Sequence, residues 1–237
     1  LTENLCDRSA ALRCLLLFTV LPVFFGASFF MTPDAPLYAA WAACLYFLER
    51  TLIAGKQRAW LGVGVAIGLG MLAKYSIALL GIATLTFLVI DRPSRKWLLR
   101  PQPYIAALVG GMLFSPVLIW NMRNHWASFM FQGPSRWKGN DEFSVHYLVL
   151  SVLLVLTPVG LLALGRLMRP ERFTATTDFH DSGSAQRQRQ RLWWLNFTLV
   201  PLSIFLLNSV NNDFKLHWTG PVFLAAMPWL ARDMVPQ

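Results

Sequence analysis

Two ionisable side chains stand out because each interrupts an apolar stretch of the chain. Asp34 lies between Pro33 and Pro36 at the junction of two apolar runs, and Lys74 lies in the middle of a third. The prolines end the first helix and start the next, so Asp34 is expected at a helix N-terminus, which favours an ionised carboxylate. Such a carboxylate can orient or deprotonate a nucleophile, and a lysine held away from water can stabilise an anionic leaving group. The alternatives are a capping Asp34 and a Lys74 that reaches the membrane interface.

The composition is typical of a polytopic, all-α membrane protein, which we interpret as a single transmembrane domain over residues 1–237. Of its residues 55% are hydrophobic and 14% are charged, and the mean hydropathy is +0.46. The net charge of +9 does not indicate nucleic-acid binding, because the cations fall in short clusters between apolar runs. The three cysteines lack C-x-x-C spacing and predict neither disulfides nor a metal site.

About eight hydrophobic helical segments are predicted along the chain. As one helix, residues 60–90 would measure roughly 46 Å, against a hydrocarbon core of ~30 Å. Basic residues flank this stretch at both ends, so we predict a short helical hairpin at 60–90 with Lys74 at its tip. The other segments cover approximately residues 10–30, 36–53, 104–120, 147–167, 192–210 and the run that begins at 221.

The positions of the cations predict the orientation of these segments. With the N-terminus in the cytoplasm, sixteen of the 21 Lys and Arg residues lie on the inner side, as the positive-inside rule requires. The stretch 170–191, rich in Ser, Thr, Gln and Arg, is then a cytoplasmic loop. Asp34 and Lys74 face the opposite, non-cytoplasmic side. The five cations on that side are Lys74, Arg123, Arg136, Lys138 and Lys215.

Polar and aromatic side chains of the predicted external loops complete the candidate site. Polar residues that converge on one face of a membrane bundle usually mark a site. With Asp34 as the candidate catalytic residue, the candidates for substrate binding are Lys74, Tyr75, Asn121, His125, Gln132, Lys215, His217 and Trp218. Two histidines without a carboxylate at ligand spacing predict no metal site, and a divalent cation is the one cofactor that they leave open.

Four sequence blocks carry a resemblance to a known family. They are T-P-D-A-P-L (32–37), G-L-G-M-L-A-K-Y-S (68–76), the stretch 115–132 that begins S-P-V-L-I-W-N, and K-L-H-W (215–218). Their order and spacing resemble the bacterial branch of the dolichyl-phosphate-mannose-protein mannosyltransferase family, glycosyltransferase family 39 of the GT-C class. Its relatives include the lipid A aminoarabinose transferase and the lipopolysaccharide galacturonosyl transferases.

This resemblance implies a GT-C-like fold and a membrane glycosyltransferase. It implies a polyprenyl-phosphate sugar donor and a lipid, glycan or protein acceptor, on the periplasmic or external face of the bacterial cytoplasmic (inner) membrane. It also implies that Asp34 lies near the reaction centre and Lys74 near the donor phosphate. Membrane lipids are expected partners, and nucleic acids are not.

One motif of the family is absent. Members carry a catalytic Asp, usually followed by Glu, in an external loop upstream of the Thr-Pro-Asp block, whereas the acids before Asp34 here are Glu3 and Asp7, on the predicted cytoplasmic side. We therefore expect a fragment that lacks this loop and is inactive alone, with Asp34 as the base being the less favoured alternative. An Asp34 paired with Lys74 would be better suited to orienting the acceptor.

Two further interpretations of the sequence are weaker. Gly64 and Gly68 have the GxxxG spacing of closely packed membrane helices, and no strand precedes them to make a dinucleotide loop. A carrier or flippase for a lipid-linked or anionic substrate is the alternative function, because ionisable pairs also line translocation paths. The unequal spans and single occurrence of each motif favour the transferase over an inverted-repeat carrier.

Overall fold

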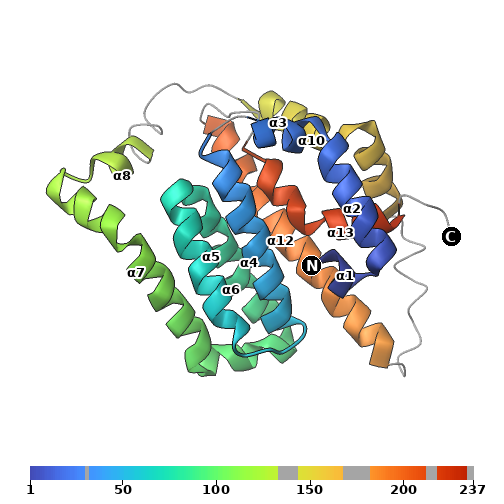
Figure 1. Ribbon diagram of the computed structural model, residues 1–237, viewed down its shortest axis with the longest axis horizontal. Coiled ribbons are helices and arrows are strands. Elements are labelled where there is room, and N and C mark those ends of the chain that lie inside the picture. The colour runs from blue at the N-terminus through green and yellow to red at the C-terminus, as the bar shows by residue number, and fades with distance from the viewer. Residues whose placement is uncertain (30–31, 133–143, 168–181, 212–217, 234–237) are drawn as a thin grey trace.

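The computed structural model describes residues 1–29, 32–132, 144–167, 182–211 and 218–233, and every regular element in these ranges is helical (Figure 1). The predicted all-α class is confirmed. The α-helices are α1 (Thr2–Leu5), α2 (Arg8–Val20), α3 (Pro22–Phe29), α4 (Asp34–Leu52), α5 (Ala59–Ala73), α6 (Ala78–Ile90), α7 (Pro101–Arg123), α8 (Ala127–Gln132), α10 (Val145–Leu167), α12 (Ser182–Asn211) and α13 (Met227–Asp233). The 3-10 helices are η1 (Tyr75–Ile77), η2 (Arg92–Leu99) and η3 (Gly220–Ala225).

Helices α5 and α6 form the predicted hairpin. Lys74 has an extended backbone (φ −159°, ψ 133°) and separates α5 from η1. The two outer ends of the hairpin return to the same end of the bundle, where the Trp60 and Trp97 rings lie 5.7 Å apart and Gln102 Nε2 donates to Gln57 Oε1 at 3.3 Å. Lys74 is therefore at the opposite end, about 22 Å away along the 15 residues of α5.

Helix α5 lies between α4 and α7 and is the central element of this half of the molecule (Figure 1). Two glycines allow α7 to approach it closely. A Cβ atom on Gly64 would overlap the backbone carbonyl of Ala106, and one on Gly68 would lie 2.8 Å from Leu113 Cβ and 3.0 Å from Gly110 Cα. The predicted GxxxG packing is confirmed. Because Gly64 faces Ala106 and Gly68 faces Gly110, α5 and α7 run parallel, both toward the hairpin tip.

Two helices of the described ranges are long and apolar enough to cross a membrane, namely α7 and the Ala185–Val210 part of α12. A third is obtained if Tyr75–Ile90 and Arg92–Leu99 count as one span despite a bend of 113° between them. Ala59–Ala73 and Val145–Thr157 are shorter apolar helices. Many large apolar side chains of α5, α6 and α7 face outward, as expected for helices in contact with lipid. These include Leu61, Leu69, Leu85, Val89, Leu108 and Met112.

Two predicted apolar segments are interrupted in the structure. The segment at 10–30 is two helices, because Leu21 is extended (ψ 121°) and Pro22 starts α3. The segment that begins at 221 is divided into η3 and α13, whose residues from Gly220 to Ala231 are buried against α2, α4 and α12. Figure 1 shows α13 crossing the interior of the bundle.

Helix α12 starts earlier than the sequence predicts. Residues 182–191 of the predicted cytoplasmic loop are its first turns, and residues 170–181 lie outside the described residues. Within these turns Arg189 donates from Nε and Nη2 to the Asp91 carboxylate at 3.2 and 2.9 Å, and from Nη2 to the Leu52 carbonyl at 2.7 Å. Asp91 is buried, so this bidentate ion pair holds α12 against the ends of α4 and α6.

Candidate functional site

Asp34 and Lys74 form an ion pair at the tip of the hairpin. Lys74 Nζ donates to Asp34 Oδ1 at 2.7 Å, and 27% of the lysine side chain and 16% of the aspartate side chain are exposed. Asp34 is the first residue of α4, with Pro33 as the N-cap and Pro36 in the first turn, as the two prolines predict. The structure thus joins two residues 40 positions apart in the sequence.

Close packing of α4 against α5 brings the two partners together. A Cβ on Gly70 would overlap Ile77 Cδ1 and lie 3.0 Å from Ala40 Cβ, so only glycine lets both elements approach here. The Gly70 carbonyl accepts the last bond of α5, from the Lys74 N–H at 2.8 Å, and the helix ends there because the Lys74 backbone is extended. Ile77 is fully buried and fixes η1 on the other side of the break. The position of Lys74 is therefore set by packed backbone on both sides.

A hydrogen-bond network fixes Tyr75, the next residue along the chain. The Tyr75 hydroxyl is 2.9 Å from Ser128 Oγ, and Ser128 donates from its N–H (3.1 Å) and its Oγ (2.8 Å) to Asn121 Oδ1. Asn121 Nδ2 donates to the Val117 carbonyl at 2.9 Å, and Asn121 is fully buried. The Asn121 carboxamide thus connects α7 to Ser128 of α8 and, through the Ser128 hydroxyl, to Tyr75.

Aromatic rings pack around this network. The Tyr75 ring stacks on Phe129 with centroids 5.3 Å apart and meets the edge of Phe114 at 5.6 Å. The chain turns back from α7 to α8 through two consecutive residues with positive φ, His125 (51°) and Trp126 (57°), a conformation that is uncommon for such side chains. The Trp126 N–H closes the turn by donating to the Asn121 carbonyl at 2.8 Å. Helix α8 is therefore folded back against the hairpin tip.

The remaining predicted site residues are not joined to this cluster by the described contacts. His125 is exposed on the turn between α7 and α8. Trp218 precedes η3, and its ring is 6.3 Å from Phe205 of α12. Gln132 is the last residue of α8, with its side chain outside the description, and Lys215 and His217 lie outside the described residues. Among the residues that the structure covers, no group of three His, Cys, Asp or Glu side chains could hold a metal ion.

Sequence reasoning missed Ser128, which connects Tyr75 to Asn121. Serine is common in polar loops, and its role depends on the left-handed turn that precedes α8. The one available signal is its position seven residues after Asn121, which becomes informative only when the turn is known.

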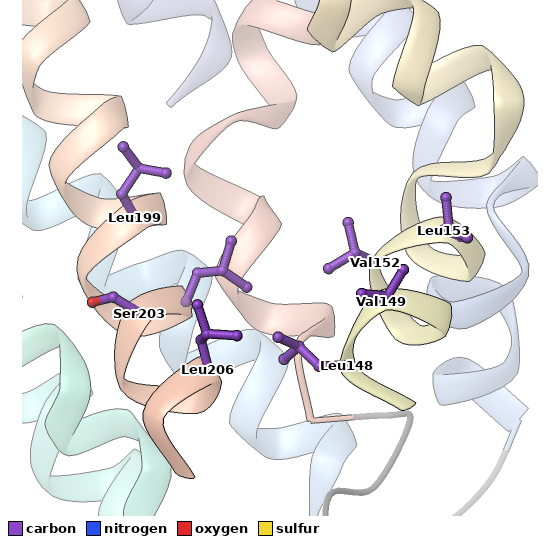
Figure 2. A pocket seen from close by; sticks show the side chains of 8 residues that line it. Leu148, Val149, Val152, Leu153, Leu199, Ser203 and Leu206 are labelled. Carbon is purple, nitrogen blue, oxygen red and sulfur yellow. The ribbon is translucent and has the colours of Figure 1, made fainter. Parts of the chain in front are cut away.

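An apolar groove between α10 and α12 was also not predicted. It has a volume of about 370 Å³, and Figure 2 shows the side chains of both helices that face it. Helix α12 contacts α6 through Arg189 and Asp91, and Asn196 Nδ2 donates to the Ala83 carbonyl, so α12 rises toward the hairpin tip and the groove lies toward that end. Its lining residues are Leu148, Val149, Val152, Leu153, Leu199, Leu202, Ser203 and Leu206.

Comparison with known families identifies the chain. A family model described as "Dolichyl-phosphate-mannose-protein mannosyltransferase" matches residues 1–120, a stretch that contains both Asp34 and Lys74. No curated protein and no solved structure matches the chain. The matched stretch is half of the 237 residues. The chain therefore belongs to the dolichyl-phosphate-mannose-protein mannosyltransferase family, and it is a membrane glycosyltransferase of the mannosyltransferase type.

Proposed function

We propose that this glycosyltransferase takes a sugar from a polyprenyl-phosphate donor and transfers it to a lipid, glycan or protein acceptor at the non-cytoplasmic face of the membrane. The observation that carries the proposal is the ion pair between Lys74 and Asp34 at the tip of the hairpin. The pair places two groups side by side: the Lys74 ammonium, which can bind a phosphate, and the Asp34 carboxylate, which can bind an acceptor. Both groups are partly buried, and both belong to the part of the chain that the family model matches.

Lys74 is suited to stabilise the phosphate that leaves when the sugar is transferred. Two unit charges 4 Å apart interact with about 1 kcal/mol in water and about 4 kcal/mol at the effective dielectric of a partly buried site. The gain is realised as charge develops on the leaving phosphate, so it lowers the barrier to transfer. A fully exposed lysine would give little of this effect, and Lys74 is about three-quarters buried.

Asp34 acts on the acceptor and on Lys74. It already accepts a hydrogen bond from Lys74 at Oδ1, so this oxygen is occupied while the pair is intact. A donor phosphate that binds Lys74 competes with Asp34 for the ammonium, and the carboxylate then becomes available to orient the acceptor nucleophile. Asp34 thereby couples donor binding to acceptor positioning.

The groove between α10 and α12 suits the lipid part of the donor. Apart from the Ser203 hydroxyl, its lining side chains are aliphatic, and that hydroxyl donates to the Val200 carbonyl at 2.8 Å. An aliphatic groove can bind an isoprenoid chain but gives a sugar few hydrogen-bond partners. Because the groove lies toward the hairpin tip, the chain and the phosphate of one donor would bind at the same end of the molecule.

The Asp34→Asn variant tests the role of the pair. Asparagine keeps an acceptor oxygen for Lys74 but removes the negative charge that competes with the donor phosphate. In the complete protein, we expect donor affinity to stay the same or increase, and turnover to fall about 10²-fold or more, within the range of ~10²–10⁴ for losing a positioned acid or base group. Binding of labelled polyprenyl phosphate and initial rates of sugar transfer measure the two effects separately. Unchanged turnover would remove Asp34 from the site.

The charge distribution predicts which face carries the site. The loops at the far end of the hairpin carry Lys56, Arg58, Arg92, Arg95, Lys96 and Arg100, so that end is expected in the cytoplasm. In a variant without its three native cysteines, a membrane-impermeant maleimide should label His125→Cys in intact cells and Arg58→Cys only after permeabilisation. Both positions are exposed, so accessibility to water does not distinguish them. The reverse pattern would place Lys74 on the cytoplasmic side.

A further inference from the structure

The 3-10 helix η2 lies across the cytoplasmic end of the hairpin and carries a cluster of cations. It is bent by 113° from the helix before it, so it does not continue the direction of α6. Its Ser94 and Trp97 face inward and are buried, whereas Arg92, Arg95 and Lys96 are exposed. The short segment therefore has one face fixed to the bundle and one basic face turned outward.

Exposed apolar side chains place this basic face at the edge of the hydrocarbon layer. Val89 and Ile90 at the end of α6 are exposed, as are Ile105 and Leu108 near the start of α7. Leu99, between the cations and α7, is 93% exposed. Exposed aliphatic side chains next to cations mark the boundary between acyl chains and headgroups, where lysine and arginine reach the lipid phosphates.

The cations of η2 have no anionic partner in the described part of the chain. Asp91, the adjacent carboxylate, is bonded to Arg189 and Ser94. Arg95 donates from Nε to the Val89 carbonyl at 2.9 Å, and Lys96 Nζ lies 5.8 Å from the centroid of the Trp97 ring. These contacts orient the side chains and leave their positive charge uncompensated.

We propose that the basic face of η2, formed by Arg92, Arg95 and Lys96, is a binding site for the headgroups of anionic phospholipids. Trp97 anchors the segment from inside through its contact with Trp60, so the three cations are presented at a fixed depth. Leu99 enters the acyl chains beside the bound headgroup. Each cation near a membrane surface contributes about a fivefold gain in affinity for anionic lipid, so three contribute on the order of a hundredfold. This site lies at the opposite end of the hairpin from Lys74 and does not depend on the proposed donor.

The test compares lipid retention by three forms of the protein. The first is the unmodified protein, and the second carries Arg92→Gln, Arg95→Gln and Lys96→Gln. The third is a matched control with Arg8→Gln, Arg123→Gln and Arg187→Gln, which removes the same charge from exposed positions on other helices. Each form is reconstituted in nanodiscs of phosphatidylcholine with about 30% phosphatidylglycerol and is then released from them with its bound lipids. Native mass spectrometry then measures bound phosphatidylglycerol, and thermal unfolding confirms that each form is folded.

We expect the η2 variant to bind at least tenfold less phosphatidylglycerol than the unmodified protein. The control should bind as much phosphatidylglycerol as the unmodified protein, and phosphatidylcholine binding should change in neither variant. The phosphatidylglycerol retained by the unmodified protein should also fall with increasing salt. Equal retention by the η2 variant and the unmodified protein would overturn the proposal. An equal loss in the control would overturn it too, because attraction would then follow net charge and not the η2 face. A variant that fails to fold is replaced by the single Lys96→Gln, for which about a fivefold loss is expected.

Discussion

In the complete protein, replacing Lys74 with methionine is expected to abolish sugar transfer and to leave the protein folded and inserted in the membrane. Methionine keeps an unbranched, apolar stem but removes the ammonium that meets the leaving phosphate. Removing one preorganised group that stabilises developing negative charge typically costs ~10²–10³ in rate. Loss of the partner also leaves Asp34, of which only 16% is exposed, without the cation that it now binds. Turnover and the affinity for labelled polyprenyl phosphate should both fall.

A Lys74→Arg variant is the matched control for charge. It keeps the cation at the hairpin tip but changes its shape and reach, so we expect partial turnover and donor binding well above that of Lys74→Met. Thermal unfolding and detergent solubility verify that both variants fold. Normal turnover in Lys74→Met would mean that Lys74 pairs with Asp34 for structural reasons alone.

The largest effect on stability is expected for Gly64→Ala. The new Cβ would overlap the backbone carbonyl of Ala106, so α5 and α7 must separate along their whole contact. Overpacking of this kind costs about 1–3 kcal/mol, and sometimes more where backbone has to move. Because Asn121, which positions Tyr75, is on α7, activity should fall together with stability. Thermal unfolding of the purified variant measures the change.

Two other glycines provide controls with the same chemical change. At Gly81 of α6 and Gly111 of α7, an added Cβ would have no atom within 4 Å other than the neighbouring backbone of its own helix, so nothing obstructs a methyl group. Alanine is favoured over glycine within a helix by about 1 kcal/mol, and Gly81→Ala and Gly111→Ala should be neutral or stabilising. If Gly64→Ala were as stable as Gly111→Ala, the close contact between α5 and α7 would be wrong.

The break at Lys74 and the start of α4 could be predicted from the sequence because each has a local cause. Basic clusters at both ends of residues 60–90 indicate a hairpin, and the only charged residue of that run, Lys74, lies at its middle. Prolines on both sides of Asp34 fix the start of α4 within two residues. GxxxG spacing similarly predicted close packing at Gly64, although it did not identify α7 as the partner.

The contacts that could not be predicted depend on residues far apart in the chain. Arg189 lies in a stretch whose composition resembles a solvated loop, yet it is helical and binds Asp91, 98 positions earlier. Ser128 joins Tyr75 to Asn121 only because two residues adopt a left-handed turn before α8. Composition and spacing contain no information on such pairings, since these arise when whole helices pack.

The reaction itself is the central claim, and it is tested most directly with a donor labelled on both parts. The test uses the complete protein, because we expect the chain described here to be inactive alone. The purified complete protein, in vesicles with a membrane fraction that supplies acceptors, is given a polyprenyl-phosphate sugar labelled separately on the sugar and on the lipid. We expect the bond between sugar and phosphate to break, so that sugar label on the acceptor and lipid label in free polyprenyl phosphate appear in equal amounts, both dependent on Lys74. Recovery of the donor intact, with both labels still on one molecule and moved to the other leaflet, would contradict the proposed transfer.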